Sequence, residues 1–441
     1  MTVKRRYVGR APGRLDLMGG NGNYTGGLVF EATTAEGTWA TVKLRDDRQI
    51  LFFNPQVRDI GWGDEVEYSL DDLSSDECVR QLAGASPEIR WTAYMLGAFF
   101  LLKQWFPDRI TRGANIHIKS EVPMGKGVGS SAALEVAVMK AAAFTYGVEL
   151  AGIELAAACQ WVESIITESA CGIMDHITVV LGEQGRLLPL VCQPCLPEPL
   201  VRLPHDLAVW GVHTGGPATG GAEREAARVA TFMGYKLICD WEHLPVYLDE
   251  GSQIPRWTDA RWNGYLANVQ PSLFRSNYEQ RLPESLTGNE YLQLGQTHVD
   301  PFTQVRPEVT YRVRACARHA VEENQRVRLF VELARAGAGF EQMGELMYQS
   351  HYSYTECGLG CESTDLIVSL VCEEGAASGL YGAKISGGGA GGTVVVLGRK
   401  DAADALVRVV ERFAETQGGT PYVFEGSSMG ADSFGVLTLE G

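Results

Sequence analysis

The sequence predicts an α+β protein built from two domains, and three observations carry this prediction. The chain has 441 residues, which is enough for two domains with sizeable hydrophobic cores. Strand-like and helix-like segments interleave too irregularly for a simple βαβ array. The proline-rich stretch 192–204 suits an interdomain boundary. We therefore expect one domain over residues 1–204 and a second over residues 205–441.

Periodicity predicts several elements in the first half of the chain. Leu15 and Leu17 indicate a strand that enters the core. Residues 38–53 predict a β-hairpin, because two β-branched and aromatic-rich runs flank a pair of aspartates. Residues 114–122 alternate like a half-buried strand, and residues 130–147 predict a helix that begins at a serine and stops at a glycine.

The second half is predicted less completely. A helix is expected over residues 153–166, where apolar side chains form one stripe. Residues 207–214 and 393–399 predict strands, and residues 401–416 predict a closing helix. The segment 240–300 is aromatic and weakly periodic, and no element is assigned to it.

Composition and charge exclude several classes of protein. The net charge of −16 argues against binding to duplex nucleic acid, which normally requires a basic face. The first residues contain no apolar stretch of the kind found in secretory signals. The most apolar helix-like stretch, 91–102, is too short to span a bilayer and predicts a buried helix. We therefore expect a cytoplasmic protein with no membrane or nucleic-acid partner.

Ten cysteines at irregular spacings indicate reduced thiols rather than a disulfide framework. Two close pairs, Cys192 with Cys195 and Cys357 with Cys361, would form a four-thiolate zinc site if they met in space. Proline and glycine among them equally suit loops with incidental buried cysteines. We prefer that second interpretation.

The loop VPMGKGVGSSAA (122–133) lies between a predicted strand and a predicted helix. Successive glycines leave backbone N–H groups free, and the helix N-terminus adds partial positive charge. Lys126 adds a full charge, so the loop is suited to hold an anion. It is not a Walker loop, because Gly127 follows the lysine where Ser or Thr is required. The alternative is a tight strand-to-helix turn without a ligand.

Two further glycine-rich loops need an explanation. ISGGGAGGTVVV (385–396) contains the G-x-G-x-x-G pattern, but a β-branched run follows it, whereas a dinucleotide fingerprint requires a helix there. MGGNGNYTGG (18–27) holds five glycines, two asparagines and no charged residue. Arg14 precedes this tract and is suited to grip a phosphoryl group, the alternative being an exposed surface arginine.

Four stretches, taken in order, resemble the ordered motifs of the GHMP kinases: RAPGRLDLMGGNGNYTGG, VPMGKGVGSSAA, CGIMDH and ISGGGAGG. Within that superfamily the pattern is similar to the galactokinase branch, and in particular to the L-arabinokinase domain of plants. The resemblance extends over nearly the whole chain. It implies a ribosomal-protein-S5-like α/β domain at the N-terminus and a ferredoxin-like domain at the C-terminus. It also implies ATP and Mg²⁺ in the cleft between them.

The resemblance assigns roles residue by residue. Asp175, in CGIMDH, matches the catalytic aspartate, with Arg14 beside it. Ser131 and Glu163 match the Mg²⁺ ligands, although a glutamate in that helix would otherwise be expected to face solvent. The residues implied to bind the nucleotide are Gly125, Lys126, Gly127, Val128, Gly129, Ser130, Ser131, Gly388 and Gly389. Those implied to bind the substrate are Arg14, Gly20, Asn21, Asn23, Tyr24, Gly172, Asp175 and Arg224.

Three positions depart from the family pattern. Asn23 stands where the pattern keeps an acid, and Arg224 stands where a tyrosine contacts the sugar. Both changes make the pocket more positive, so we raise the hypothesis of an anionic sugar, with solvent exposure of Arg224 or its pairing with Glu223 or Glu225 as the alternative. His176 replaces a common glutamine and suits either a hydrogen bond or an influence on Asp175.

The resemblance implies a kinase that uses ATP and Mg²⁺ to phosphorylate a monosaccharide at the anomeric hydroxyl, giving a sugar 1-phosphate. The alternatives are a kinase of uronic acids or sugar phosphates with the same fold, and a catalytically silent regulator that binds ATP and sugar. The identity of the sugar and the nucleotide preference stay open at this stage. A monomer and a weak dimer are both compatible with the sequence.

Overall fold

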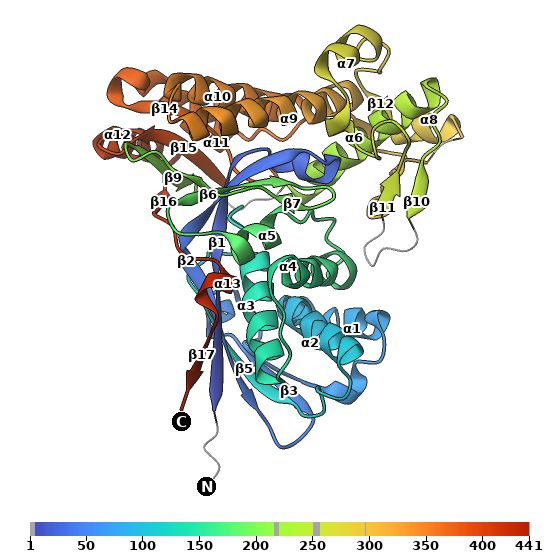
Figure 1. The fold of residues 1–441 in the computed structure, drawn as a ribbon, viewed down its shortest axis with the longest axis vertical. Helices are drawn as coiled ribbons and strands as arrows, with labels where there is room; N and C mark the ends of the chain where they lie inside the picture. The colour runs from blue at the N-terminus through green and yellow to red at the C-terminus, as the bar shows by residue number, and fades with distance from the viewer. Residues whose placement is uncertain (1–4, 216–219, 250–255, 296, 441) are drawn as a thin grey trace.

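The computed structural model describes residues 5–215, 220–249, 256–295 and 297–440 (Figure 1). It is a mixed α and β fold with two main sheets and helices packed against both. Both described ends of the chain lie together at one end of the molecule, in β1 and β17 (Figure 1). In the described part of the chain, no helix has the length and apolar character needed to cross a membrane.

The first sheet and the helices on it are formed mainly by the first half of the chain. Its strands are β1 (Arg6–Met18), β2 (Leu28–Leu44), β3 (Gln49–Phe53), β4 (Glu65–Ser69), β5 (Ala114–Ser120), β6 (Arg186–Val191), β7 (Leu196–Pro197), β8 (Val201–Arg202) and β17 (Val436–Leu439). Its helices are α1 (Asp76–Ala83), α2 (Ala93–Trp105), α3 (Ser130–Thr145), α4 (Gly152–Trp161) and α5 (Met174–Leu181).

The second half forms a smaller sheet and longer helices. Its strands are β9 (Leu207–His213), β10 (Tyr247–Asp249), β11 (Arg256–Thr258), β12 (Leu286–Thr287), β13 (Thr310–Tyr311), β14 (Leu380–Ile385), β15 (Thr393–Arg399) and β16 (Tyr422–Glu425). Its helices are α6 (Gly221–Trp241), α7 (Pro271–Asn277), α8 (Gly288–Gln293), α9 (Val313–Ala336), α10 (Phe340–Glu356), α11 (Glu362–Glu374), α12 (Ala403–Gln417) and α13 (Ala431–Phe434). The strands predicted over 207–214 and 393–399 and the helix predicted over 401–416 are confirmed, as β9, β15 and α12.

The predicted hairpin over residues 38–53 is wrong in its pairing. Both of its strands exist, as the end of β2 and as β3, but they are not neighbours. β5 lies between them, antiparallel to β2 and parallel to β3, so that Ala114 faces both Leu44 and Ile50. The sequence pattern predicts the strands correctly. It does not predict the insertion, because β5 comes from a distant part of the chain.

The core of the first sheet lies under α1–α5, which gather on one side of the long strands (Figure 1). The predicted buried helix over 91–102 is α2, which is apolar on all sides because it is enclosed by the sheet and by α1 and α3. The helix predicted over 153–166 begins as α4 and ends in a π-helical turn over Val162–Ile166. Such turns are rare and often occur at functional sites.

The second sheet has the order β14-β15-β9-β16 and packs against α11 and α12. The 192–204 stretch proposed as a domain boundary contains β7 and β8, which still pair with β6 of the first sheet. β9 then starts the second sheet. At the other end, β17 returns to pair with β1, so the last residues of the chain contribute to the first sheet.

The segment 240–300, which the sequence does not assign, forms a lobe beside α6 and α9. Short paired strands and α7 and α8 surround an aromatic cluster, whose buried members include Trp257, Trp262 and Tyr278. The aromatic side chains supply enough apolar surface for a core where the elements are too short to show periodicity.

The two long helices α9 and α10 enclose a neutral histidine. His319 is 4% exposed, and its Nδ1 lies 2.8 Å from the Ser353 hydroxyl. Burial lowers the pKa of His319 to about 4, because the imidazolium would lose its hydration. The unfolded chain protonates this group near pH 6.5, so the unfolded state gains protons first as the pH falls.

We therefore predict that acid destabilises the protein partly through His319. Between about pH 7.5 and about pH 4.5, the free energy of unfolding should fall by about 2 kcal/mol more in the wild type than in His319→Asn. Urea unfolding at both pH values measures this difference. Parallel losses of stability in the two proteins would contradict the prediction.

Candidate active site

A cavity of about 650 Å³ lies where the two halves of the chain meet. Its lining includes residues from the 18–27 tract, the 122–133 loop and the 385–396 loop. Most residues predicted for the site line it: Arg14, Asn21, Asn23, Tyr24, Gly125, Gly127, Gly129, Ser130, Ser131, Glu163, Gly172, Asp175, Arg224 and Gly388. The fold therefore brings together residues that are far apart in the sequence.

Four predicted residues lie behind the lining. Val128 is buried, and its carbonyl accepts the backbone N–H of Arg14. The carbonyl of Lys126 accepts a hydrogen bond from Thr393. Gly20 and Gly389 both pack against the ring of Tyr354 or its hydroxyl, and a Cβ on Gly20 would stand only 1.6 Å from that hydroxyl oxygen. Their contribution is to bring the loops into place.

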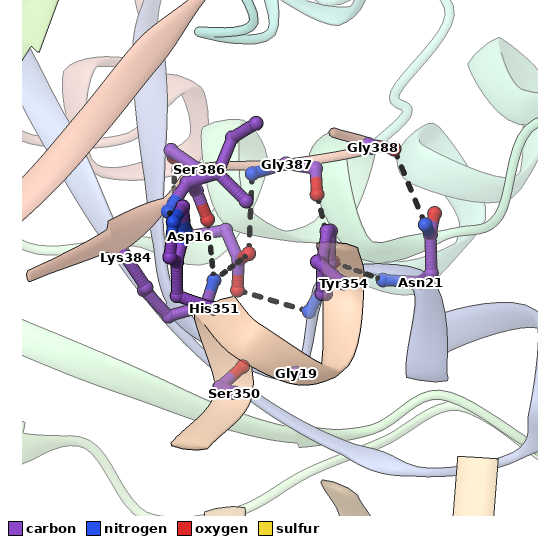
Figure 2. Close-up of polar contacts among 12 residues, drawn as sticks. Asp16, Gly19, Asn21, Ser350, His351, Tyr354, Lys384, Ser386, Gly387 and Gly388 are labelled. Atoms are coloured by element: carbon purple, nitrogen blue, oxygen red, sulfur yellow. Dashed lines mark hydrogen bonds and ion pairs between the residues drawn. The ribbon is translucent and has the colours of Figure 1, made fainter. Parts of the chain in front are cut away.

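The buried carboxylate of Asp16 holds two glycine loops together (Figure 2). Its Oδ2 accepts Lys384 Nζ at 2.8 Å and the Gly387 N–H at 3.1 Å, and its Oδ1 accepts the Gly20 N–H at 3.0 Å. Asp16 and Lys384 are both fully buried. A buried charge is tolerated only when it is paired and hydrogen-bonded, so this pair fixes the loops relative to each other.

Tyr354 of α10 forms a second tie between the same loops (Figure 2). Its hydroxyl accepts the N–H of Asn21 at 2.7 Å and donates to the carbonyl of Gly387 at 2.9 Å. The Asn21 side chain donates to the carbonyl of Gly388 at 3.2 Å. The tract 18–27 therefore packs against the 385–396 loop instead of facing solvent.

Arg14 and Asp175 form a bidentate ion pair at the cavity. Arg14 Nε lies 2.8 Å from Oδ1 of Asp175 and Nη2 lies 2.8 Å from Oδ2. Nη1 of Arg14 donates to the carbonyl of Gly127 at 2.6 Å, so the arginine also contacts the 122–133 loop. Despite burial, the carboxylates around Arg14, first Asp175 and then Glu31, raise its pKa. The guanidinium is always charged at neutral pH.

Glu31 adds a buried acidic group behind this pair. Its side chain is fully buried, and its Oε2 lies 3.9 Å from Arg14 Nε. Burial and the nearby Asp16 raise the pKa of Glu31 well above its usual range. Both causes oppose a third negative charge next to Asp16 and Asp175.

The 122–133 loop exposes the start of α3 to the cavity. Gly125, Gly127 and Gly129 all have positive φ, between 67° and 76°. Gly129 precedes the helix, and no side chain caps the N–H groups of its first turn. Free N–H groups and the helix dipole together favour an anion there.

Glu163 lies in the π-helical turn and is 7% exposed, so it does not face solvent as a plain helix position would. His176 Nε2 lies 3.2 Å from the carboxylate of Glu163 and 2.8 Å from that of Glu135. Among the described residues, no hydrogen bond or ion pair joins His176 to Asp175. The hydrogen-bonding role expected for His176 is thus directed at these two glutamates. The two carboxylates outweigh burial and raise the pKa of His176 to about 10.

The pKa values of the two glutamates that contact His176 shift in opposite directions. Burial and the charge of Glu163 raise the pKa of Glu135 to about 8. Although burial acts against ionisation of Glu163, the bonds from His176 and Ser131 lower its pKa. Glu163 is therefore a carboxylate, beside the Ser131 hydroxyl, at the edge of the cavity.

One cluster of possible metal ligands occurs among the described residues: Glu163, Cys171 and His176, with ligand atoms within 4.8 Å of one another. Nε2 of His176 already faces the carboxylates of Glu135 and Glu163. The carboxylate of Glu163 and the hydroxyl of Ser131 instead suit a hard cation such as Mg²⁺. Cys192, Cys195, Cys357 and Cys361 form no such cluster in the described ranges.

Several lining residues have no sequence signal that predicts them. Arg228 forms a buried bidentate pair with Asp300, at 2.7 and 2.9 Å, and donates to the carbonyl of Ala170. Its guanidinium lies 5.1 Å from the centre of the Tyr24 ring. Phe302 and Thr303 follow Asp300 along the wall of the cavity. Phe302 and Thr303 come directly after the unassigned segment 240–300, and only their tertiary position makes them part of the site.

Three protein-family models match parts of the chain. The model of the GHMP kinases N terminal domain matches residues 93–183, and the model of the GHMP kinases C terminal domain matches residues 330–416. The galactokinase galactose-binding signature matches residues 2–44. Each of the three matched segments contributes residues to the cavity.

Curated relatives agree with these matches. The chain is 34% identical to L-arabinokinase of Arabidopsis thaliana over 98% of its own length, and it spans 47% of that protein. It is 28% identical to a galactokinase of Chloroflexus aurantiacus over 91% of its length, covering 86% of that relative. It therefore spans about half the length of the arabinokinase and most of the galactokinase.

Solved structures share the fold. The structure of Lactococcus lactis galactokinase complexed with galactose aligns with a TM-score of 0.75 at 22% identity, over 99% of this chain and 95% of that one. A mevalonate kinase aligns with a TM-score of 0.57 at 13% identity, over 96% of this chain and 99% of that one. The overall fold is therefore shared with these kinases.

The Asp16–Lys384 pair yields a stability prediction. Asp16→Asn leaves the buried Lys384 ammonium without its counter-ion, so the free energy of unfolding should fall by about 3 to 5 kcal/mol. Asp401→Asn is the matched control, because its pair with Arg399 is exposed and such pairs contribute less than about 1 kcal/mol. Urea unfolding measures both. Equal, small losses would mean that Asp16 does not hold the loops.

Proposed function

Because the chain belongs to the GHMP kinase family, we propose that it transfers the γ-phosphoryl group of ATP to the anomeric hydroxyl of a monosaccharide, giving a sugar 1-phosphate. The bidentate Arg14–Asp175 pair carries this proposal, because it places a carboxylate at the cavity beside a loop suited to phosphates. The family resemblance and the two-domain kinase fold expected from the motifs are confirmed. Curated relatives are named L-arabinokinase and galactokinase.

Phosphoryl transfer requires charge neutralisation on the triphosphate. We assign this task to the N–H groups of residues 125–131 and to the N-terminus of α3. The positive charge of Lys126 is assigned to the same task, and Ser131 and Glu163 would hold Mg²⁺. When bound, Mg²⁺ neutralises charge on the transferring phosphoryl group.

Asp175 is proposed as the group that receives the proton of the attacking hydroxyl. Arg14 fixes both of its oxygens, and each oxygen keeps a lone pair for a substrate hydroxyl. The sugar oxygen then forms its bond to the γ-phosphorus while the bond to the bridging oxygen of ADP breaks, and the sugar proton passes to Asp175. The Arg14 charge also stabilises the developing negative charge on the phosphoryl oxygens.

The tract 18–27 is proposed to bind the sugar hydroxyls. Asn23 is 9% exposed, and its Nδ2 donates to the carbonyl of Gly20, whereas its Oδ1 has no hydrogen-bond partner. A buried acceptor without a partner costs free energy, and a sugar hydroxyl would satisfy it. Gly172 packs against this oxygen, where a Cβ would stand only 1.5 Å away.

A silent regulator that binds ATP and sugar is the second candidate, and turnover distinguishes the two. A cytoplasmic location, a monomeric or weakly dimeric state, and a domain boundary between residues 204 and 205 remain predictions.

The catalytic roles predict a large effect of Asp175→Asn. With ATP and Mg²⁺, kcat on the best of a panel of pentoses, hexoses and uronic acids should fall about a hundredfold to ten-thousandfold, because the proton acceptor is lost. Glu168→Gln is the control, because Glu168 lines the same cavity without contacting Arg14. ADP release measures both. Wild-type turnover in Asp175→Asn would contradict its role, and ATP binding without turnover on any sugar would favour the regulator.

The packing of Asn23 predicts a separate effect on sugar binding. Gly172→Ala should displace the Asn23 amide and raise the KM for the sugar about tenfold or more, while the KM for ATP changes little. Gly221→Ala is the matched control, because Gly221 lines the same cavity and a Cβ there meets no atom within 4 Å. Steady-state kinetics with each substrate varied in turn measure this. An unchanged KM for the sugar would exclude Asn23 from the sugar site.

A further inference from the structure

We propose that the sugar bound by this chain carries an oxyanion, either a carboxylate or a phosphate, and that Arg224 pairs with it. The inference rests on the proposed kinase function and specifies its substrate class. The anomeric hydroxyl would still be the group that is phosphorylated. The oxyanion would lie where Arg224 enters the cavity.

Arg224 lies in the first turn of α6 and lines the cavity. Its Cδ stands 2.6 Å from the place where a Cβ on Gly388 would be, so its stem crosses that glycine closely. The carbonyl of the same glycine accepts the Asn21 side chain at 3.2 Å. Arg224 therefore reaches the cavity beside the 18–27 tract, on the side proposed to bind the sugar.

Four arginines line this cavity, and three of them have carboxylate partners. Arg14 is paired with Asp175, Arg228 with Asp300, and Arg306 with Glu225 at 2.6 Å.

Within the described residues, Arg224 forms no recorded hydrogen bond or ion pair. The alternative of pairing with Glu225 is not realised, because Arg306 occupies that carboxylate. The charge of Glu223 acts on Arg224 from the same helix, but in the described part of the chain no ion pair or hydrogen bond joins the two side chains.

The guanidinium of Arg224 is partly buried and has no ion-pair partner among the described residues, which costs free energy. Burial lowers the pKa of Arg224 by more than the nearby charges of Glu223 and Asp175 raise it, and the positive charge of Arg14 lowers it further. Charged groups that lose hydration are normally paired, and a planar guanidinium matches a carboxylate or phosphate through two parallel hydrogen bonds. An anion from the ligand would complete the arrangement.

The rest of the sugar pocket agrees with an anionic ligand. The tract 18–27 contains no acidic residue, and Asn21 and Asn23 offer amides where a carboxylate would repel an anion. The unpartnered Oδ1 of Asn23 is suited to a hydroxyl donor. The amides are suited to bind sugar hydroxyls, and the guanidinium is suited to bind an oxyanion. A uronic acid or a sugar phosphate carries both kinds of group.

The test compares sugars that differ in the group at C6, which is neutral, a carboxylate or a phosphate ester. ATP consumption is measured with galactose, galacturonate and galactose 6-phosphate, and with glucose and glucuronate, for the wild type and Arg224→Gln. We expect the wild type to have a higher kcat/KM for an anionic sugar than for its neutral counterpart. Comparison of galacturonate with galactose 6-phosphate then tells whether the oxyanion is a carboxylate or a phosphate. Arg224→Gln should lower kcat/KM for that sugar about tenfold to hundredfold, as expected for a hydrogen bond to a charged group.

The variant should leave the KM for ATP and the activity on neutral sugars nearly unchanged. Arg306→Gln is the matched control, because it removes another arginine of the cavity wall whose charge is already paired. A preference for galactose or glucose overturns the proposal. A rise in the KM for ATP with every sugar also overturns it, because Arg224 would then serve the triphosphate.

A binding measurement separates this inference from the kinase function. Calorimetric titration of galacturonate, galactose and galactose 6-phosphate is performed without ATP on the same variants. If no sugar is phosphorylated, the proposed kinase function fails. Tighter binding of an anionic sugar, lost in Arg224→Gln and kept in Arg306→Gln, would still support the pairing with Arg224. Equal or absent binding of the three sugars overturns it.

Discussion

The site depends on one fully buried ion pair, between Asp16 of β1 and Lys384 of β14. The same carboxylate accepts N–H groups from Gly20 and Gly387, so one side chain positions the first and the last glycine loops of the chain. Breaking such a pair leaves an uncompensated charge in the core, whereas the intact pair selects one arrangement of its surroundings. The contact between the 18–27 tract and the 385–396 loop thus follows from electrostatics in the core as well as from the path of the backbone.

The cavity is surrounded by charges that are nearly all compensated. Arg14 is bound to Asp175, Arg228 to Asp300, and His176 lies between Glu135 and Glu163. Preorganised charges of this kind need little rearrangement when a charged substrate arrives, which is how electrostatic catalysis is achieved. Against this background the unpaired guanidinium of Arg224 and the unpartnered oxygen of Asn23 are exceptions, and both face the space proposed for the sugar.

Sequence reasoning predicts the local features of this site and misses the pairings between distant residues. The glycine loops and Arg14 carry local signals, whereas Asp175 is found through the resemblance of its short motif, CGIMDH, to the GHMP kinases. The Asp16–Lys384 and Arg228–Asp300 pairs carry no such pattern, since each joins residues that only the fold brings together. The wrong hairpin over residues 38–53 has the same cause, because the strand that separates β2 from β3 comes from residues 114–120.

The central claim is that this cavity transfers a phosphoryl group from ATP to a sugar rather than to water. Phosphorus NMR of the purified chain with ATP, Mg²⁺ and a sugar of the panel tests this directly, because the product is identified by its own resonance. The account predicts a new phosphomonoester resonance, coupled to the anomeric proton and formed in equal amount with ADP. ADP accompanied only by inorganic phosphate, or ATP that stays intact with every sugar, would contradict it.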